Sequence, residues 1–355
     1  DFGYDVADYC NVDPVFGSLA AFDRLQGALK ARGIRTILDF VPNHVGVHFA
    51  DNPRWLDMLE WGPASPDAAS FDVDWEQLPH RARGGIMLPI LGSPYGQALE
   101  GGEIELRYDS EGGSFSAWYY EHRLPIRPNR YGEILKNVVA EAGATEEEAG
   151  RRLLAFAGRY PDPNAPSREQ APTYKAELAA IEGGAEVIER GLAAYRPSEA
   201  DPNRILLLHR LLERQHYRVA HWRVAFTEIN YRRFFDIMEL ACVRMEDPQV
   251  FDEAHVLVLD LLRKGSLDGL RIDHVDGLAD PGGYLARLDA AMREATGRPR
   301  YILVEKILGE GERLPESWPV AGTTGYEALV LINGLFIDPA GLELLPRPAG
   351  MDPAF

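Results

Sequence analysis

The chain has 355 residues, 46% of them hydrophobic, which is enough to bury a large core in one large or two modest domains. Its 37 basic and 55 acidic side chains give a formal net charge of −18. Such an acidic surface repels phosphate backbones and anionic membranes, so we expect neither nucleic acid nor a membrane as a partner. The composition favours a soluble enzyme with a neutral substrate.

The cysteines and the start of the chain bear on its cellular context. Cys10 and Cys242 are the only cysteines, and two distant cysteines do not make a disulfide framework. This fits a reducing compartment and predicts a cytoplasmic location. There is no initiator Met, and Asp1 begins in what reads as the middle of a fold. We therefore expect a fragment of a longer protein.

The first 45 residues have the pattern of a parallel α/β fold. Apolar residues at helical spacing predict a helix over 18–32, with Ser18 as its N-cap and Gly33 as its C-terminal stop. A β-branched, apolar run over 36–41 predicts a buried strand, which Pro42 ends. A helix, a short turn and a buried strand are the repeating unit of such folds.

An irregular inserted subdomain is predicted for residues 46–132. This segment is rich in Gly, Pro and Trp, and short strands are expected over 103–108 and 115–120. Its aromatic side chains, Trp55 among them, are either the small core of the subdomain or platforms on which sugar rings stack.

A helical insertion is predicted for residues 133–230. Its first helix is expected to open with a capping box, Thr145 followed by Glu148. The Ala- and Glu-rich segment 174–195 predicts a second helix, and an apolar stripe from Leu208 to Phe226 predicts a third.

The α/β rhythm resumes in residues 231–355. The expected elements are a helix over 254–262, a strand over 268–273, a helix over 282–295 and a strand over 300–305. Together with residues 1–45, this order suits an α/β fold of the (β/α)8 TIM-barrel type, incomplete here, with a long inserted subdomain and a helical excursion. In such barrels the chemistry lies in the loops that follow the strands.

Three polar clusters fall where apolar strands end: residues 39–44 (Asp-Phe-Val-Pro-Asn-His), 269–274 (Gly-Leu-Arg-Ile-Asp-His) and 304–306 (Val-Glu-Lys). Because a strand alternates its faces, Arg271 and Asp273 are expected on one side, where the Arg keeps the Asp ionised. A lone carboxylate at a strand end is more often a cap or half of an ion pair. Retaining glycoside chemistry, however, needs two carboxyl groups about 5–5.5 Å apart, one nucleophilic and one that donates and then accepts a proton. Asp273 and Glu305 are candidates for this pair.

These clusters resemble three of the four sequence signatures of the α-amylase superfamily. The resemblance implies that Asp273 is the nucleophile, that Glu305 is the acid/base and that Arg271 positions the nucleophile. It also implies that His44 and His274 hydrogen-bond hydroxyls of the sugar being cleaved.

A closer resemblance, over roughly residues 50–340, is to the maltooligosyl trehalose synthase family. Its most discriminating part is Glu-Lys-Ile-Leu at 305–308 followed by Gly-Thr-Thr-Gly-Tyr at 322–326. The resemblance implies a (1→4)-α-D-glucan 1-α-D-glucosylmutase, an isomerase that turns the reducing-end α-1,4 linkage of a maltooligosaccharide into an α,α-1,1 linkage. Lys306 is then a substrate-binding candidate, and neither a cofactor nor a metal is expected.

Some residues depart from this family pattern. The opening resembles an α-glucosidase, in which the residues matching Asp1 and Tyr4 bind the non-reducing terminal sugar, so both are substrate-binding candidates. Val275 stands where a Pro is expected, and the fourth signature, with a third catalytic carboxylate, is missing between Tyr326 and Phe355. Two alternatives stay open: a hydrolase of α-1,4-glucans of the α-glucosidase or α-amylase type, and an inactive glucan-binding fragment.

Overall fold

The computed structural model describes residues 3–47, 52–76, 85–160, 166–198, 200–338 and 340–341. The chain forms two compact units: unit 1 comprises Asp1–Asp8 and His44–Val250, and unit 2 comprises Tyr9–Asn43 and Phe251–Phe355. The four segments expected from the sequence, with boundaries at 45, 132 and 230, stay a prediction.

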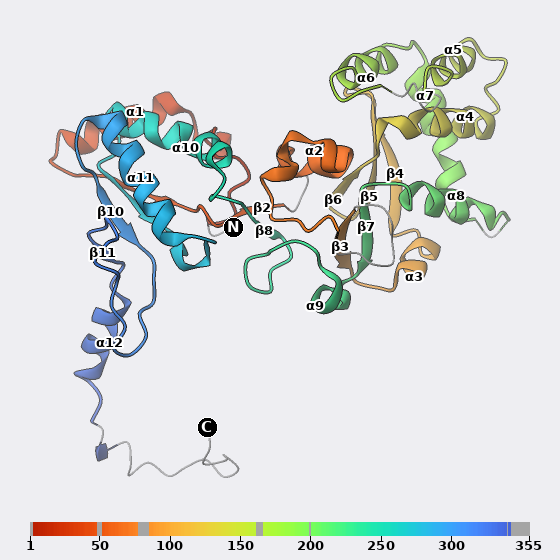
Figure 1. Cartoon of the computed structure of the whole chain (residues 1–355). Coiled ribbons are helices and arrows are strands. Elements are labelled where there is room, and N and C mark those ends of the chain that lie inside the picture. Colours follow the sequence, from red (N-terminus) through yellow and green to blue (C-terminus); the bar gives the residue numbers. More distant parts are fainter. Residues whose placement is uncertain are drawn as a thin grey trace. The chain divides into compact units, whose positions relative to one another are not determined.

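Unit 2 is built on a four-stranded parallel sheet in the order β1-β9-β10-β11, of which β10 and β11 are labelled in Figure 1. Its strands are β1 (Ile37–Phe40), β9 (Gly269–Ile272), β10 (Tyr301–Val304) and β11 (Gly322–Thr323). β1 pairs directly with β9, although the whole of His44–Val250 lies between them in sequence. The first three strands match those predicted from the sequence.

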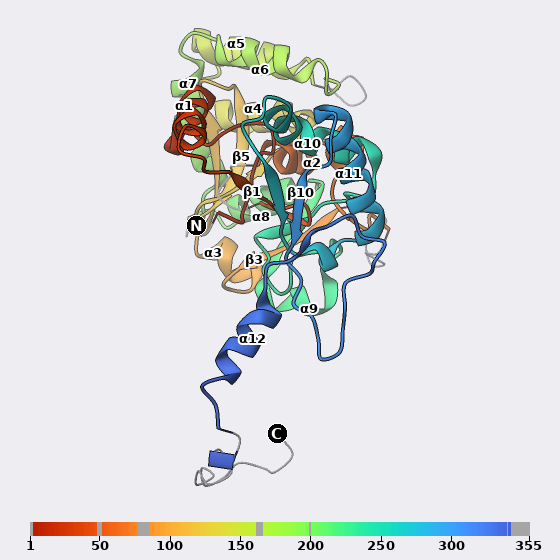
Figure 2. The same ribbon diagram turned by 90° about the vertical axis from the view of Figure 1, so that its left-hand side faces the viewer.

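The α-helices that accompany this sheet in the described part of unit 2 are α1 (Leu19–Lys30), α10 (Pro248–Arg263), α11 (Pro281–Thr296) and α12 (Tyr326–Gly334). The predicted N-cap of α1 is present, because the Ser18 hydroxyl accepts the Ala21 N–H at 3.3 Å. Leu262 of α10, Leu288 of α11 and Ile272 of β9 are fully buried and form part of the core. Helix α12 extends away from the rest of unit 2 in both views (Figures 1 and 2), and its side chains are exposed.

No helix in the described residues is both long and apolar enough to cross a membrane. The two longest, α10 and α11, have 16 residues each.

The described residues of unit 1 form three small sheets. An antiparallel sheet consists of β4 (Ile104–Asp109), β5 (Ser114–Tyr119) and β6 (His122–Pro125). A parallel pair joins β3 (Ile86–Leu91) to β7 (Tyr217–His221), and an antiparallel pair joins β2 (His44–Gly46) to β8 (Leu240–Cys242). The strands β4 and β5 confirm the two short strands predicted for the inserted subdomain.

The α-helices of unit 1 are α2 (Pro53–Trp61), α3 (Tyr95–Glu100), α4 (Tyr131–Glu141), α5 (Glu148–Ala157), α6 (Ala171–Ala179), α7 (Gly184–Gly191), α8 (Asn203–Leu212) and α9 (Ala225–Glu228). Helix α4 is central to the helical part, because Ile134, Leu135 and Val138 are fully buried. Helix α7 lies so close to α4 that a Cβ atom on Gly191 would be 2.0 Å from the Val138 carbonyl oxygen. Only glycine fits at that approach.

The predicted apolar helix from Leu208 to Phe226 is wrong. Helix α8 ends at Leu212, and the next element is the strand β7, which pairs with β3. Tyr217 and Val219 are buried while Arg218 between them is exposed, which is the two-residue period of a strand. This strand was not predicted from the sequence because its alternation of buried and exposed residues lies within the longer apolar pattern that runs from Leu208 to Phe226.

Two other helix predictions need correction. The predicted capping box at Thr145 is absent, because a turn closed by the Glu147 N–H and the Ala144 carbonyl (3.0 Å) precedes α5, which begins at Glu148. The single helix predicted over 174–195 is divided into α6 and α7. The break lies at Gly183, whose φ of 70° is a left-handed conformation that ends a helix.

Candidate active site

Arg271 joins three carboxylates at the end of the parallel sheet of unit 2. Its Nη1 donates to Asp273 Oδ1 at 2.7 Å, its Nη2 lies 3.1 Å from Glu305 Oε1, and its Nε lies 3.2 Å from Asp39 Oδ1. The Arg271 side chain is only 15% exposed. One guanidinium therefore fixes the positions of both predicted catalytic carboxyl groups.

Backbone pairing explains why these carboxylates meet. The Asp273 N–H donates to the Phe40 carbonyl at 2.9 Å, and the Glu305 N–H donates to the Ile272 carbonyl at 2.8 Å. Each carboxylate thus comes directly after the last residue of a parallel strand and is tied to the neighbouring strand. Because the carboxyl ends of parallel strands lie at one edge of a sheet, both side chains project from the same edge.

The charges of the cluster are unbalanced, with three carboxylates around one guanidinium. Burial and the neighbouring Glu305 carboxylate raise the pKa of Asp273 to about 6, although Arg271 acts in the opposite direction. Burial alone raises the pKa of Glu305 as well, but the His274 N–H, the Arg271 charge and the hydrogen bond with Asp273 outweigh it and lower that pKa. Arg271 therefore favours ionised Asp273, as predicted, but does not by itself determine its protonation. The two carboxyl groups titrate as a pair that shares a proton.

The residues beside the pair form a second ionic group. Lys306 Nζ lies 2.9 Å from Glu312 Oε1 and 3.7 Å from Asp276 Oδ2, and the hydrogen bond with Glu312 raises the pKa of Lys306. His274 has a left-handed backbone, with φ of 43°, and its Nδ1 lies 3.7 Å from Asp276 Oδ1. Both substrate-binding candidates thus lie beside the carboxylate pair.

Gly277 allows the turn after Asp273 to close. A Cβ atom there would lie 2.2 Å from the His274 ring and 2.9 Å from Asn43 Oδ1. The absence of a side chain at this position therefore permits Gly277 to lie close to both the His274 ring and the Asn43 side chain.

The remaining predicted site residues are not in unit 2. His44 is buried in unit 1, where its Nε2 lies 3.1 Å from the Tyr4 carbonyl oxygen and its ring is 4.2 Å from that of Phe234. Tyr4 is also in unit 1 and is 37% exposed. Asp1 lies outside the described residues. The structure therefore brings together Arg271, Asp273, His274, Glu305 and Lys306, and it places His44 beside Tyr4.

Two polar residues of the cluster were not among the predicted site residues. Asp39 is the third carboxylate on Arg271, and the Tyr326 hydroxyl donates to Glu305 Oε1 at 3.2 Å. Asp39 could have been found, because it stands at a strand end opposite Arg271 in the register of β1 and β9. Tyr326 had a weaker signal, since it only closes the Gly-Thr-Thr-Gly-Tyr run at 322–326.

Within the described residues, no group of three or more His, Cys, Asp or Glu side chains is placed to hold a metal ion. At the carboxylate cluster, the guanidinium of Arg271 already lies among the oxygens of Asp39, Asp273 and Glu305. The expectation that no metal is required stays a prediction.

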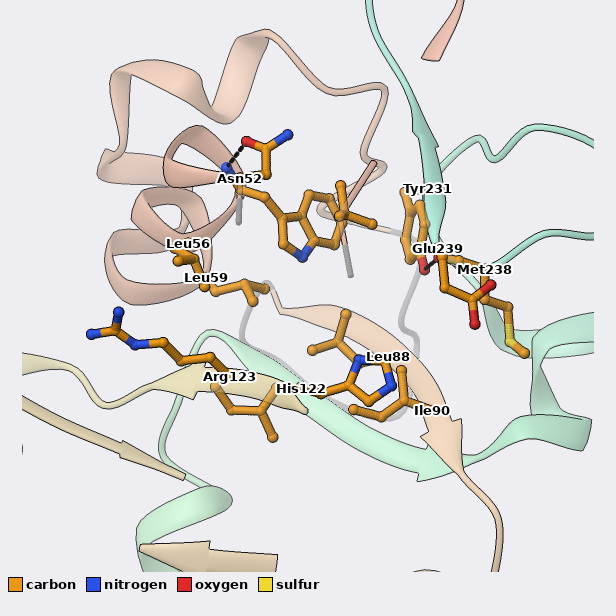
Figure 3. Close-up of a pocket in the computed structure, with 13 residues that line it drawn as sticks. Asn52, Leu56, Leu59, Leu88, Ile90, His122, Arg123, Tyr231, Met238 and Glu239 are labelled. Atoms are coloured by element: carbon orange, nitrogen blue, oxygen red, sulfur yellow. Dashed lines mark hydrogen bonds between the residues drawn. The ribbon is translucent and has the colours of Figure 1, made fainter. Parts of the chain in front are cut away.

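A separate cavity lies within unit 1 and has a volume of about 70 Å³ (Figure 3). Helix α2 and strands β3 and β6 supply much of its lining, including Trp55, Leu59 and Leu88. Trp55 is only 4% exposed and makes edge contacts with Phe71 and Tyr231, whose ring centres are 5.0 and 5.4 Å away. Trp55 is therefore part of the core of the subdomain rather than an open platform for a sugar ring.

Comparisons with known proteins give short matches as well as matches over nearly the whole length of the chain. Residues 1–59 match the family model for the alpha amylase catalytic domain. A shorter similarity, 41% identity over 58 residues, is to an alpha-glucosidase of Apis mellifera and covers 16% of this chain and 10% of that protein.

Over its whole length the chain is similar to maltooligosyl trehalose synthases. It is 34% identical over 354 residues to a Mycobacterium tuberculosis protein of that name, a match that covers 99% of this chain and 34% of the relative. The structure of maltooligosyltrehalose synthase from Arthrobacter ramosus is similar at 33% identity and a TM-score of 0.65, covering 96% of this chain and 33% of that one. The chain thus spans about a third of the length of these relatives. The resemblance predicted from the sequence motifs is confirmed, and the fold is TIM-barrel-like.

Proposed function

We propose that the chain carries the catalytic carboxylates of a (1→4)-α-D-glucan 1-α-D-glucosylmutase, the activity of a maltooligosyl trehalose synthase. One observation carries this proposal: Asp273 and Glu305 follow neighbouring parallel strands and are bound by the same guanidinium, that of Arg271. The similarity to proteins of that name, over 99% of this chain, supports a maltooligosaccharide as the substrate.

The reaction is a retaining double displacement in two steps. Asp273 attacks the anomeric carbon of the penultimate glucosyl unit, and Glu305 gives its proton to the O4 oxygen of the terminal glucose as that bond breaks. The terminal glucose stays bound and turns. Glu305 then takes the proton from the anomeric hydroxyl of this glucose, which attacks the same carbon and releases Asp273. The product is an isomer that ends in an α,α-1,1 linkage, so no water is consumed.

The carboxylate pair must hold one proton on Glu305 and none on Asp273 when the substrate is bound. In the structure, burial and Glu305 raise the pKa of Asp273 to about 6, so the shared proton favours Asp273. In the first step the glycosidic oxygen takes its proton from Glu305, and the positive charge that develops at the anomeric carbon as the bond breaks stabilises the ionised form of Asp273. Substrate binding thus completes the arrangement of charges that the first step needs.

The other predicted site residues have supporting roles in this proposal. Arg271 positions the nucleophile, and His274 and Lys306 bind sugar hydroxyls from unit 2. His44, Tyr4 and Asp1 are the other residues proposed to contact the sugar. Because a bound glucose must be kept from water while it turns, the residues around it exclude solvent as well as bind the sugar.

The proposal extends to the fold and the cellular location of the chain. Strands β1, β9, β10 and β11 supply part of a (β/α)8 barrel, and His44–Val250 is an insertion into it. The acidic composition supports a neutral glucan rather than nucleic acid or a membrane surface as partner. The low cysteine content supports a cytoplasmic location.

A hydrolase of α-1,4-glucans is the second candidate. The observation in its favour is the similarity of 58 residues to an alpha-glucosidase. The two candidates share both carboxylates and differ in whether water or the retained glucose enters at the second step. Their products therefore distinguish them.

Incubation of the full chain with maltopentaose tests the proposal. The mutase predicts loss of reducing ends without matching glucose release, and a product that ends in trehalose. A rise in reducing ends identifies the hydrolase instead. Binding of maltopentaose without turnover, unchanged in Asp273→Asn, identifies an inactive glucan-binding chain.

A further inference from the structure

The carboxylate of Glu305 receives donors on both of its oxygens. Its Oε1 lies 3.1 Å from Arg271 Nη2 and accepts the Tyr326 hydroxyl at 3.2 Å, while its Oε2 accepts the His274 N–H at 3.2 Å. The Arg271 guanidinium also pairs with Asp273 and Asp39, so its charge is shared among three carboxylates. Tyr326 is a neutral side-chain donor directed at Glu305.

The chain places Tyr326 at this point through the pairing of β10 with β11. Val304, which immediately precedes Glu305, is in register with Thr323, and its carbonyl accepts the Thr324 N–H at 3.1 Å. Gly325 then adopts a left-handed conformation with φ of 91°, and its N–H donates to the Thr323 hydroxyl at 3.2 Å. This turn brings the first residue of α12, Tyr326, to the carboxyl end of β10.

We propose that Tyr326 is a positioning residue that, with Arg271, anchors Oε1 of Glu305 and so leaves proton transfer to Oε2. This rests on the proposed role of Glu305 as the acid/base. The Arg271 and Tyr326 donors at Oε1 disfavour a proton on that oxygen, whereas the His274 backbone N–H contacts Oε2. A neutral hydroxyl remains a donor whether Glu305 is ionised or protonated. It can therefore hold the carboxyl group through both steps of the reaction without itself changing charge.

The hydroxyl also affects the proton affinity of the acid/base. Hydrogen bonds to an ionised carboxylate favour the ionised form. Three other residues act on the proton affinity of Glu305 together with Tyr326: His274, Arg271 and Asp273. Two further charged groups lie in the cluster, where Asp39 pairs with Arg271 and Lys306 pairs with Asp276 and Glu312. Loss of one neutral donor among these groups removes a local hydrogen bond and leaves every formal charge in place.

The test is Tyr326→Phe in the full chain, with Tyr301→Phe as the matched control. Tyr301 is an exposed tyrosine at the opposite end of the same strand, β10. With maltopentaose, Tyr326→Phe is expected to lower kcat roughly tenfold with KM within about twofold, because positioning of an acid/base affects the transition state more than binding. The alkaline limb of the kcat profile should move to higher pH, since Glu305 then loses its proton less readily. Tyr301→Phe should change neither quantity.

A second measurement does not depend on turnover. Carboxyl-labelled glutamate allows the titration of Glu305 to be followed by NMR, with its signal assigned by its loss in Glu305→Gln. The titration of Glu305 should move to higher pH in Tyr326→Phe and stay unchanged in Tyr301→Phe. An unchanged titration and an unchanged alkaline limb in Tyr326→Phe would overturn the proposal. If the unsubstituted chain does not convert maltopentaose, the proposed function fails, and the NMR titration alone decides whether Tyr326 holds Glu305.

Discussion

Asp273 should lower the stability of the folded chain at neutral pH, and Asp273→Asn should restore it. Burial and Glu305 raise the pKa of Asp273 from 3.8 to about 6. Between these values the folded chain binds more protons at this position than the unfolded chain does. Stability is therefore fully present below pH 3.8 and is lost as the pH rises towards 6. Asn resembles the protonated carboxyl group and avoids this loss.

The pKa shift gives the size of the effect. Each pKa unit corresponds to about 1.4 kcal/mol. A shift from 3.8 to about 6 therefore costs about 1 kcal/mol at pH 4.5 and about 3 kcal/mol at pH 7.5. The gain in free energy of unfolding from Asp273→Asn should grow by at most about 2 kcal/mol between these two pH values. Because the titration of Asp273 is coupled to that of Glu305, the difference of about 2 kcal/mol is an upper limit.

Urea unfolding, followed by circular dichroism at a series of pH values, measures this difference. Asp260→Asn is the matched control, because hydrogen bonds from Lys264 and Arg263 lower the pKa of Asp260. The change in free energy of unfolding caused by Asp260→Asn should therefore have the opposite sign. This variant should become less stable than the unsubstituted chain as the pH rises. If Asp273→Asn also became relatively less stable with rising pH, the ionised carboxylate would be stabilising and the reasoning refuted.

Three further predictions follow from packing, hydrogen bonding and charge. Gly191→Ala should lower the free energy of unfolding by about 2 to 3 kcal/mol, because a methyl group cannot fit beside the Val138 carbonyl. Gly96→Ala is the control and should not destabilise the chain, because there is open space around Gly96. Equal melting temperatures for the two variants would contradict this prediction. Asn230→Ala should lower the free energy of unfolding, measured with urea, by about 3 kcal/mol, because this buried amide accepts the Met87 N–H and donates to two backbone carbonyls. A loss below about 1 kcal/mol would contradict this prediction. Arg271→Lys should lower kcat on the order of 100-fold, because the ammonium group of Lys lacks the rigid, planar set of donors with which the guanidinium binds three carboxylates. An unchanged kcat with maltopentaose would contradict this prediction.

The sequence predicted those features that depend on short, regular patterns. The strands before Asp273 and Glu305 were recognisable because apolar runs end in charged residues, and their parallel pairing brings both carboxylates to Arg271. The N-cap of α1 at Ser18 was likewise readable from local chemistry.

Other features depend on tertiary contacts. β7 is a strand because β3 pairs with it, and its sequence alone continued the apolar stripe of α8. Tyr326 reaches Glu305 only through the register of β11 and the turn at Gly325. The raised pKa of Asp273 results from burial and from Glu305, two contributions that oppose the Arg271 charge read from the motif.

The most direct test of the account is to trap the covalent intermediate on Asp273. Glu305→Gln should be incubated with α-maltosyl fluoride, whose fluoride leaves without protonation while the missing base slows the second step. The account predicts that proteolysis and mass spectrometry will find one peptide, the one that contains Asp273, with an added maltosyl group, and none in the chain that also carries Asp273→Ala. A maltosyl group on another residue, or no labelled peptide at all, would contradict the assignment of Asp273 as the nucleophile.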